Sequence, residues 1–172
     1  MKGKNYRIPS GMPLTSKKFA PSAPHSKIAR FSTGTASPDY DYMLKLVSKE
    51  RSQVRHSAIE AARVAANKKM TLLGEKNYFI QVKVYPHVIL RENKMIATAG
   101  ADRLQEGMRR SYGKPRDLGA RLNIGSVLLQ LSVNNIHLAQ AKQAFKTAAS
   151  KMPMTTDIQI IPLNPSGKTL TK

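Results

Sequence analysis

The alternation of apolar and polar residues along the chain predicts where its strands lie, because side chains point alternately to the two faces of a strand. A period of two marks residues 27–32, 42–47, 78–90, 121–133 and 156–162. Pro86 interrupts the third of these segments, so we expect a bend or a sheet edge there and a second strand at residues 87–91. In residues 121–133 the apolar positions change parity, which predicts a β-bulge at Gly125 and Ser126.

Two further segments repeat apolar residues at the spacing of a helix. In the first, residues 57–73, Ser57 and Glu60 fit a capping box, and a start one turn earlier near Ser52 is also consistent. Gly74 suits the position just past its end. The second helix would be capped by Asn134 or Asn135 and would continue through residue 150. The positions expected to face the core are Ile59, Ala62, Ala66, Met70 and Leu73 in the first helix and Ile136, Ala139, Phe145 and Ala148 in the second.

This order of strands and helices predicts an α+β fold, a two-layer α/β sandwich in which two helices cover a mixed, mostly antiparallel sheet. We expect one such domain at residues 39–163, since domains commonly hold ~100–200 residues. Residues 1–38 contain five of the ten prolines, seven basic residues and no acid, which predicts an extended basic arm. Residues 164–172 form a polar tail.

The charge of the chain indicates a polyanionic partner. Its 172 residues include 29 Lys+Arg and 10 Asp+Glu, a formal net charge of +19, and self-repulsion of this size opposes compaction in isolation. The basic residues are spread along the chain instead of marking one recognition element, which favours a protein surrounded by RNA over a DNA-binding domain. There is no cysteine and no apolar run of 18 residues, so we expect no disulfide, thiolate zinc site or membrane-spanning helix.

A long basic segment, residues 93–117, separates two of the predicted strands. At ~25 residues it exceeds the median connection of roughly 4–6 residues, and connections of this length are usually functional or disordered. Three glycines and a proline argue against one regular element across it. Within it, charge makes Arg110 a candidate for contact with nucleic acid, and the capacity of an aromatic ring to stack on a base makes Tyr112 another.

Charge alone nominates further residues for contact with RNA phosphates. The candidates in the predicted arm are Lys4, Arg7, Lys17, Lys18, Lys27 and Arg30. Those in the rest of the chain are Arg63, Lys68, Lys83, Arg91, Arg116 and Arg121. For Arg63 and Lys68, which lie on the first predicted helix, a solvated helix face is an equally good interpretation.

The sequence gives little support for an active site. Gly107, Gly113 and Lys114 superficially suggest a phosphate-binding loop, but five residues instead of four separate the glycines and a proline follows the lysine. Asp102 and Glu106 are four residues apart, as two carboxylates of a nuclease could be, although local ion pairs with neighbouring arginines are the better interpretation. The four histidines lack the spacing of metal ligands. We therefore expect no enzyme, no cofactor and no metal site.

Four motifs together resemble one known family. They read A-G-A-D-R-L-Q-E-G-M-R at residues 99–109, Y-G-K-P at 112–115, A-R-L-N-I-G at 120–125 and I-E-A-A-R-V-A-A-N-K-K-M at 59–70. This pattern is similar to the large-subunit ribosomal protein L-sixteen family, in the branch often called L-ten-e, and to its archaeal type. Arg110-Ser111-Tyr112 stands where that family has small residues and a phenylalanine, which makes the tip of the loop more polar.

The resemblance implies a structural role in the large ribosomal subunit of the cytoplasmic ribosome. The protein would bind ribosomal RNA near the central protuberance and the peptidyl transferase centre, with neighbouring ribosomal proteins and the vicinity of 5S rRNA as further partners. The loop would reach toward the acceptor ends of bound tRNAs and support their positioning in translation. The resemblance carries this role to Lys94, Arg103, Gln105, Met108, Arg109 and Lys114. Two alternatives stay open, a free-standing RNA-binding or regulatory module and a metal-dependent nuclease that uses Asp102 and Glu106.

Overall fold

The computed structural model describes residues 2–13, 15, 20, 22–37, 39–94 and 111–163. Its helices are α1 (His56–Met70) and α2 (Leu138–Ala149). Its strands are β1 (Ser32–Gly34), β2 (Tyr42–Ser48), β3 (Ser52–Arg55), β4 (Tyr78–Val82), β5 (Val88–Glu92), β6 (Lys114–Leu122), β7 (Val127–Val133) and β8 (Thr156–Pro162). Short 3-10 turns lie at Gly3–Tyr6, Thr71–Leu73, Glu75–Asn77 and Asn135–His137.

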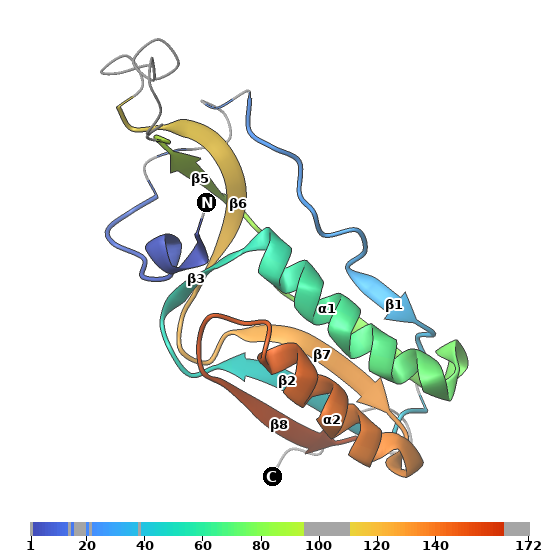
Figure 1. The fold of residues 1–172 in the computed structure, drawn as a ribbon. Helices are drawn as coiled ribbons and strands as arrows, with labels where there is room; N and C mark the ends of the chain where they lie inside the picture. Colours follow the sequence, from blue (N-terminus) through green and yellow to red (C-terminus); the bar gives the residue numbers. More distant parts are fainter. Residues whose placement is uncertain are drawn as a thin grey trace.

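The strands form two antiparallel sheets, a five-stranded one in the order β1-β4-β7-β2-β8 and a three-stranded one in the order β3-β6-β5. In Figure 1, α1 and α2 pack against each other on one face of the larger sheet, and the smaller sheet extends from one end of that layer. The predicted α+β class with two helices is confirmed. The single mixed sheet that we expected is instead divided into two antiparallel sheets.

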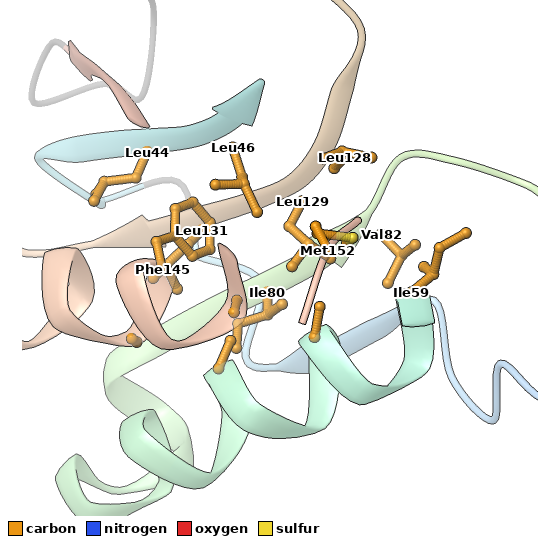
Figure 2. Close-up of a cluster of buried hydrophobic side chains, with 14 of the residues drawn as sticks. Leu44, Leu46, Ile59, Ile80, Val82, Leu128, Leu129, Leu131, Phe145 and Met152 are labelled. Atoms are coloured by element: carbon orange, nitrogen blue, oxygen red, sulfur yellow. The ribbon is translucent and has the colours of Figure 1, made fainter. Parts of the chain in front are cut away.

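The core lies between the two helices and the larger sheet (Figure 2). The predicted stripe on α1 is confirmed, because Ile59, Ala62, Ala66 and Met70 are all buried, whereas Leu73 is only partly buried. Small alanine side chains on both helices leave the two backbones close together. Phe145 of α2 fills the space against the sheet and is completely buried, as predicted.

The boundary between β6 and β7 differs from the prediction. We expected one strand over residues 121–133 with a bulge at Gly125 and Ser126, but the chain leaves the small sheet at Leu122 and enters the larger one at Val127. The amide of Ser126 donates to the carbonyl of Asn123 (3.1 Å), and Gly125 has a φ of 85°, which favours glycine. The change of parity in the sequence therefore marks a turn between two sheets.

Both helix starts also need correction. The residue before α1 is Arg55 and no side chain caps the helix, so neither the predicted capping box nor a start near Ser52 is right, since residues 52–55 form β3. In α2 the 3-10 turn Asn135–His137 delays the helix by three residues. This delay shifts the buried stripe to Ala141, Ala144, Phe145 and Ala148, and leaves Ile136 (83% exposed) and Ala139 at the surface.

Other boundaries follow the pattern more closely. The strand at Thr156–Pro162 is confirmed, and Pro86 does separate two strands, although β4 and β5 belong to different sheets. The short strand expected at residues 27–32 lies at Ser32–Gly34. The segment between β5 and β6 covers residues 93–113, because β6 already begins at Lys114. No helix in the described part of the chain is long and apolar enough to span a bilayer.

Candidate nucleic-acid interface

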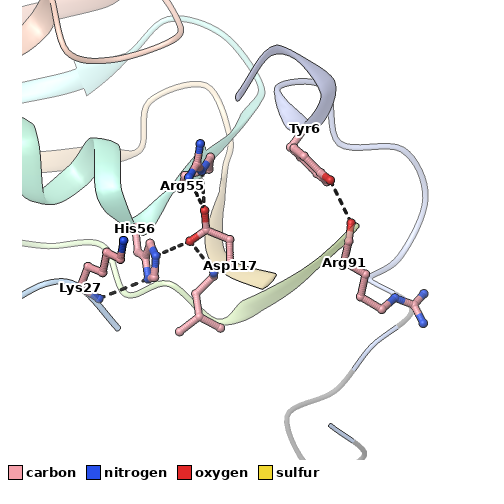
Figure 3. A network of polar contacts seen from close by, with 7 residues as sticks. Tyr6, Lys27, Arg55, His56, Arg91 and Asp117 are labelled. Carbon is pink, nitrogen blue, oxygen red and sulfur yellow. Dashed lines mark hydrogen bonds and ion pairs between the residues drawn. The ribbon is translucent and has the colours of Figure 1, made fainter. Parts of the chain in front are cut away.

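The N-terminal segment, by which we mean the described residues before β1, crosses the smaller sheet from one edge strand to the other at residues 6 and 7. The backbone amide of Gln53 in β3 donates to the carbonyl of Arg7 (2.7 Å), and its side-chain amide donates to the carbonyl of Tyr6 (3.1 Å). At the opposite edge, the Tyr6 hydroxyl donates to the carbonyl of Arg91 in β5 (2.9 Å), as Figure 3 shows. Residues 6 and 7 therefore bridge β3 and β5, and the segment adds hydrogen bonds at both edges of the sheet.

A buried carboxylate joins this sheet to the start of α1 (Figure 3). Asp117 lies in β6, and its Oδ2 accepts a hydrogen bond from Nε of Arg55 (2.6 Å) and forms an ion pair with Nη2 of Arg55 (2.5 Å). Its Oδ1 accepts from the amide of Leu118 (3.1 Å) and contacts Nε2 of His56, the first residue of α1. A carboxylate this deeply buried requires such partners, since an unpaired buried charge is strongly unfavourable.

His56 is neutral in this arrangement. The backbone amide of Lys27 donates to its Nδ1 (3.2 Å), so the proton of the neutral ring lies on Nε2, which faces Asp117. Burial lowers the pKa of His56 below its ordinary value of 6.5. The Asp117 carboxylate opposes this shift of the pKa, and the charges of Lys27 and Arg55 add to it. The histidine thus links the N-terminal segment to β6 without adding charge.

The two strands on either side of the basic loop form a closely packed stem. Glu92 lies opposite Lys114 in the last pair of the ladder between β5 and β6. Beyond it, the side-chain amide of Asn93 donates to the carbonyl of Ser111 (3.3 Å). Gly113 has a φ of 88°, and a Cβ atom there would lie 2.5 Å from the backbone of Glu92 and Asn93. Glycine is therefore required at Gly113, where the segments before and after the loop cross closely.

Beside the stem lies an open groove of about 250 Å³ between the N-terminal segment and the small sheet. Tyr6, Arg91, Tyr112 and Arg121 are among the residues that line it. The guanidinium of Arg91 lies over the ring of Tyr112, 5.6 Å from its centroid, and that ring is 78% exposed. Arg121 is held by hydrogen bonds to the side chain of Gln53 (3.1 Å) and to a backbone carbonyl of the N-terminal segment. An exposed aromatic ring supported by a cation offers a surface on which a nucleobase can stack.

Most of the basic residues nominated from the sequence lie at the surface. Those that are exposed are Lys4, Arg7, Lys27, Arg30, Lys68, Lys83, Lys94, Lys114 and Arg116, and those that are half-buried are Arg91 and Arg121. Tyr112, Lys94 and Lys114 surround the base of the loop, and Arg116 follows on β6. Arg7 is already paired with Glu50 (2.7 Å) in this conformation. Five of the candidates, Arg91, Lys94, Tyr112, Lys114 and Arg116, belong to the paired strands of the stem or to the residues next to them.

Arg63 does not belong to this set. Its side chain is buried in the structure (8% of the residue is exposed), and its guanidinium pairs with Glu60 one turn earlier (2.6 Å) and donates to the hydroxyl of Thr33 in β1 (3.2 Å). The hydrogen bond to Glu60 raises the pKa of Arg63. Because its donors are directed to these partners, Arg63 fastens α1 to the edge strand and is not presented to phosphate.

Several nominated residues lie outside the described residues. These are Lys17 and Lys18 before β1 and Asp102, Arg103, Gln105, Glu106, Met108, Arg109 and Arg110 in the loop. Within the described residues, no group of three or more His, Asp or Glu side chains is placed to hold a metal ion.

The sequence reasoning missed the residues that hold the stem. His56 was one of four scattered histidines, and Asp117 was counted only as an acid within the basic segment. Their partner Arg55 is 62 positions from Asp117, and no local spacing signals such a contact. The sequence offers no local signal for Asp117 either, because β6 contains Lys114, Arg116 and Arg121 as well and does not read as an apolar strand with one buried acid.

Comparison with known proteins gives a consistent result. Residues 9–159 match the family model described as "Ribosomal protein L16p/L10e". The chain is 47% identical to the large ribosomal subunit protein uL16 of Staphylothermus marinus over 92% of both chains. It is 48% identical to that of Hyperthermus butylicus over 92% of this chain and 89% of the relative, and 46% identical to that of Metallosphaera sedula over 94% of both.

The lowered pKa of His56 predicts how stability depends on pH. Below pH 6.5 the unfolded chain binds a proton at this histidine that the folded chain does not, so the free energy of unfolding should be steady above pH 6.5 and fall as the pH drops toward the lowered pKa. Urea unfolding between pH 7.5 and 5.5 measures this slope. His56→Gln should flatten it.

The exposed His25 provides the matched control, since His25→Gln should leave the slope unchanged. A His56→Gln variant with the same pH slope as the unmodified protein would show that His56 is not the group responsible.

Proposed function

Because the chain belongs to the ribosomal protein L16p/L10e family, we propose that its small sheet and N-terminal segment dock on large-subunit ribosomal RNA near the central protuberance and the peptidyl transferase centre. The archaeal-type resemblance seen in the motifs is confirmed. As a member of this family the chain is a structural constituent of the large ribosomal subunit in the cytoplasm and is not an enzyme. The nuclease alternative is therefore rejected.

The observation that carries the docking proposal is the exposed cluster at the stem. Lys94, Lys114 and Arg116 lie there at the surface, next to the groove with Arg91 and Tyr112. Contacts from lysine and arginine to phosphate position a protein on folded RNA, and the stacking ring adds a surface for a base that leaves its helix. The stem thus combines phosphate contacts with base stacking, the two kinds of contact by which proteins bind single-stranded or irregular RNA.

The loop between β5 and β6 extends the same surface toward tRNA. It would reach the acceptor ends of bound tRNAs with the residues carried over from the family, namely Lys94, Arg103, Gln105, Met108, Arg109 and Lys114, together with Arg110 and Tyr112. Because the two ends of the loop lie close together at Gly113, the direction in which the loop leaves the sheet would be fixed. The ribosomal RNA performs peptide bond formation, and this chain stabilises that RNA and the position of the tRNA.

The remaining partners follow from this placement. Neighbouring ribosomal proteins and the vicinity of 5S rRNA would border the protein on its other sides. The exposed cations away from the stem, among them Lys4, Arg30, Lys68 and Lys83, fit contact with RNA on more than one side.

Tyr112→Ala removes the stacking surface and should weaken binding to large subunits that lack this protein. A stacked base contributes ~1–3 kcal/mol, so the dissociation constant should rise roughly 5- to 150-fold. Co-sedimentation of labelled protein with such subunits measures it. Tyr112→Phe keeps the ring and should bind like the unmodified protein; equal binding of Tyr112→Ala would exclude the stacking role.

Replacing residues 95–110 by a short glycine-serine linker tests the role of the loop separately from that of the stem. Closing a shorter connection costs little free energy, so folding and docking on the subunit should persist, whereas the rate of translation in a reconstituted system should fall. Deleting residues 164–172 is the control and should leave the translation rate unchanged. Failure of the linker variant to fold would mean that the loop is part of the core.

A further inference from the structure

The outer edge of β8 is open to a partner strand. Within the described residues, β8 pairs along its whole length with β2 and with no strand on its other side. Alternate residues of an edge strand direct their N–H and C=O groups away from the sheet, where another extended chain can pair with them. Residues 156–161 contain neither lysine nor proline, the residues that commonly protect such an edge, and Asp157 is paired with Lys49 (3.6 Å).

A mainly apolar groove of about 360 Å³ runs beside this edge, between β8 and α2. Its lining residues are Lys142, Gln143, Lys146, Ile158 and Ile160. The two isoleucines lie opposite the core residues Leu46 and Leu44 of β2, so the groove continues the helix-covered face of the sheet beyond its last strand. Ile160 is 37% exposed there.

We propose that this edge and groove receive an extended segment of a neighbouring protein in the large subunit, which adds a strand to β8. Its side chains would alternate, with apolar ones on Ile158 and Ile160 and at least one acidic residue facing Lys142 and Lys146. The backbone of the segment would supply the hydrogen bonds, and its apolar and acidic side chains would supply the selectivity. This docking surface lies outside the RNA contacts proposed above.

The chemistry of the groove disfavours the other occupants. RNA would bring phosphates and riboses to an apolar floor and could not pair with the backbone of β8 as a strand does. The C-terminal tail of this chain, residues 164–172, carries Lys168 and Lys172 and no acid, so its charge repels the two lysines of α2. A second copy of the chain would place Lys142 and Lys146 against a protein of net charge +19.

Photo-crosslinking in assembled large subunits tests this proposal. A benzophenone amino acid replaces Gln143 at the groove, or Gln130 of the central strand β7 as the control. After irradiation, mass spectrometry identifies the crosslinked peptides. We expect the Gln143 probe to crosslink to a ribosomal-protein segment with alternating apolar residues and an acidic residue, and the Gln130 probe not to reach that segment.

Two variants connect the crosslink to the chemistry of the site. Lys142→Glu with Lys146→Glu reverses exposed charges on α2 without touching the core, and should lower the crosslink yield on the order of tenfold or more, because like charges would then face each other. Ile160→Lys should lower it as well, while Ile124→Lys at an exposed turn should not. Crosslinks only to RNA, crosslinks to the chain's own tail, no crosslink at Gln143, or a yield unaffected by the charge reversal would each overturn the proposal.

Discussion

The buried carboxylate of Asp117 connects the small sheet to the start of α1 and, through His56, to the N-terminal segment. The proposed docking on RNA depends on these parts. Asp117 connects β6 to the junction of β3 and α1 through Arg55 and His56, and His56 in turn receives the backbone amide of Lys27 from the N-terminal segment. Removing one partner from a buried charge network leaves the other charge unpaired, which is costly in free energy. The Asp117 network therefore helps to fix the small sheet, the long helix and the N-terminal segment relative to one another, together with the hydrogen bonds of Tyr6 and Gln53.

The contacts of Asp117 hold the basic surface in a fixed geometry, although the positive charges of the chain repel one another. Some cations serve the fold itself, as Arg63 does with Glu60 and Arg55 does with Asp117. Others, such as Lys94 and Arg116 beside the stem, remain at the surface. A protein whose cations are divided in this way keeps its shape through local ion pairs and keeps enough unburied charge for a polyanion to bind.

The sequence predicts the parts of this fold that depend on local periodicity. The stripe on α1 from Ile59 to Met70 and the strand at Thr156–Pro162 were both found, because burial on one face imposes the period directly. The turn after Leu122 was predicted as a bulge because apolar residues alternate on both sides of Gly125, and the change of parity alone does not show that the chain changes sheets. In α2, the 3-10 turn at Asn135–His137 delays the start of the helix and so changes which residues face the core.

The site was predictable only in part, for a related reason. The long basic segment is visible in the sequence, and the nominated residues Lys94, Tyr112 and Lys114 lie at the surface at its base, while their contact with tRNA stays a prediction. Asp117 and His56 take their roles from partners distant in the chain, and Arg63 is buried because β1 brings Thr33 against it. Such roles follow from the tertiary arrangement, and a single sequence does not display them.

The most direct measurement is the salt dependence of binding between this protein and large subunits that lack it. If exposed lysines and arginines hold the protein on RNA phosphates, the logarithm of the association constant should fall linearly with the logarithm of the salt concentration. About six phosphate contacts would give a slope of roughly −4 to −6. Arg116→Ala should make the slope shallower by about one unit. A slope near zero, unchanged in that variant, would contradict docking through phosphate contacts.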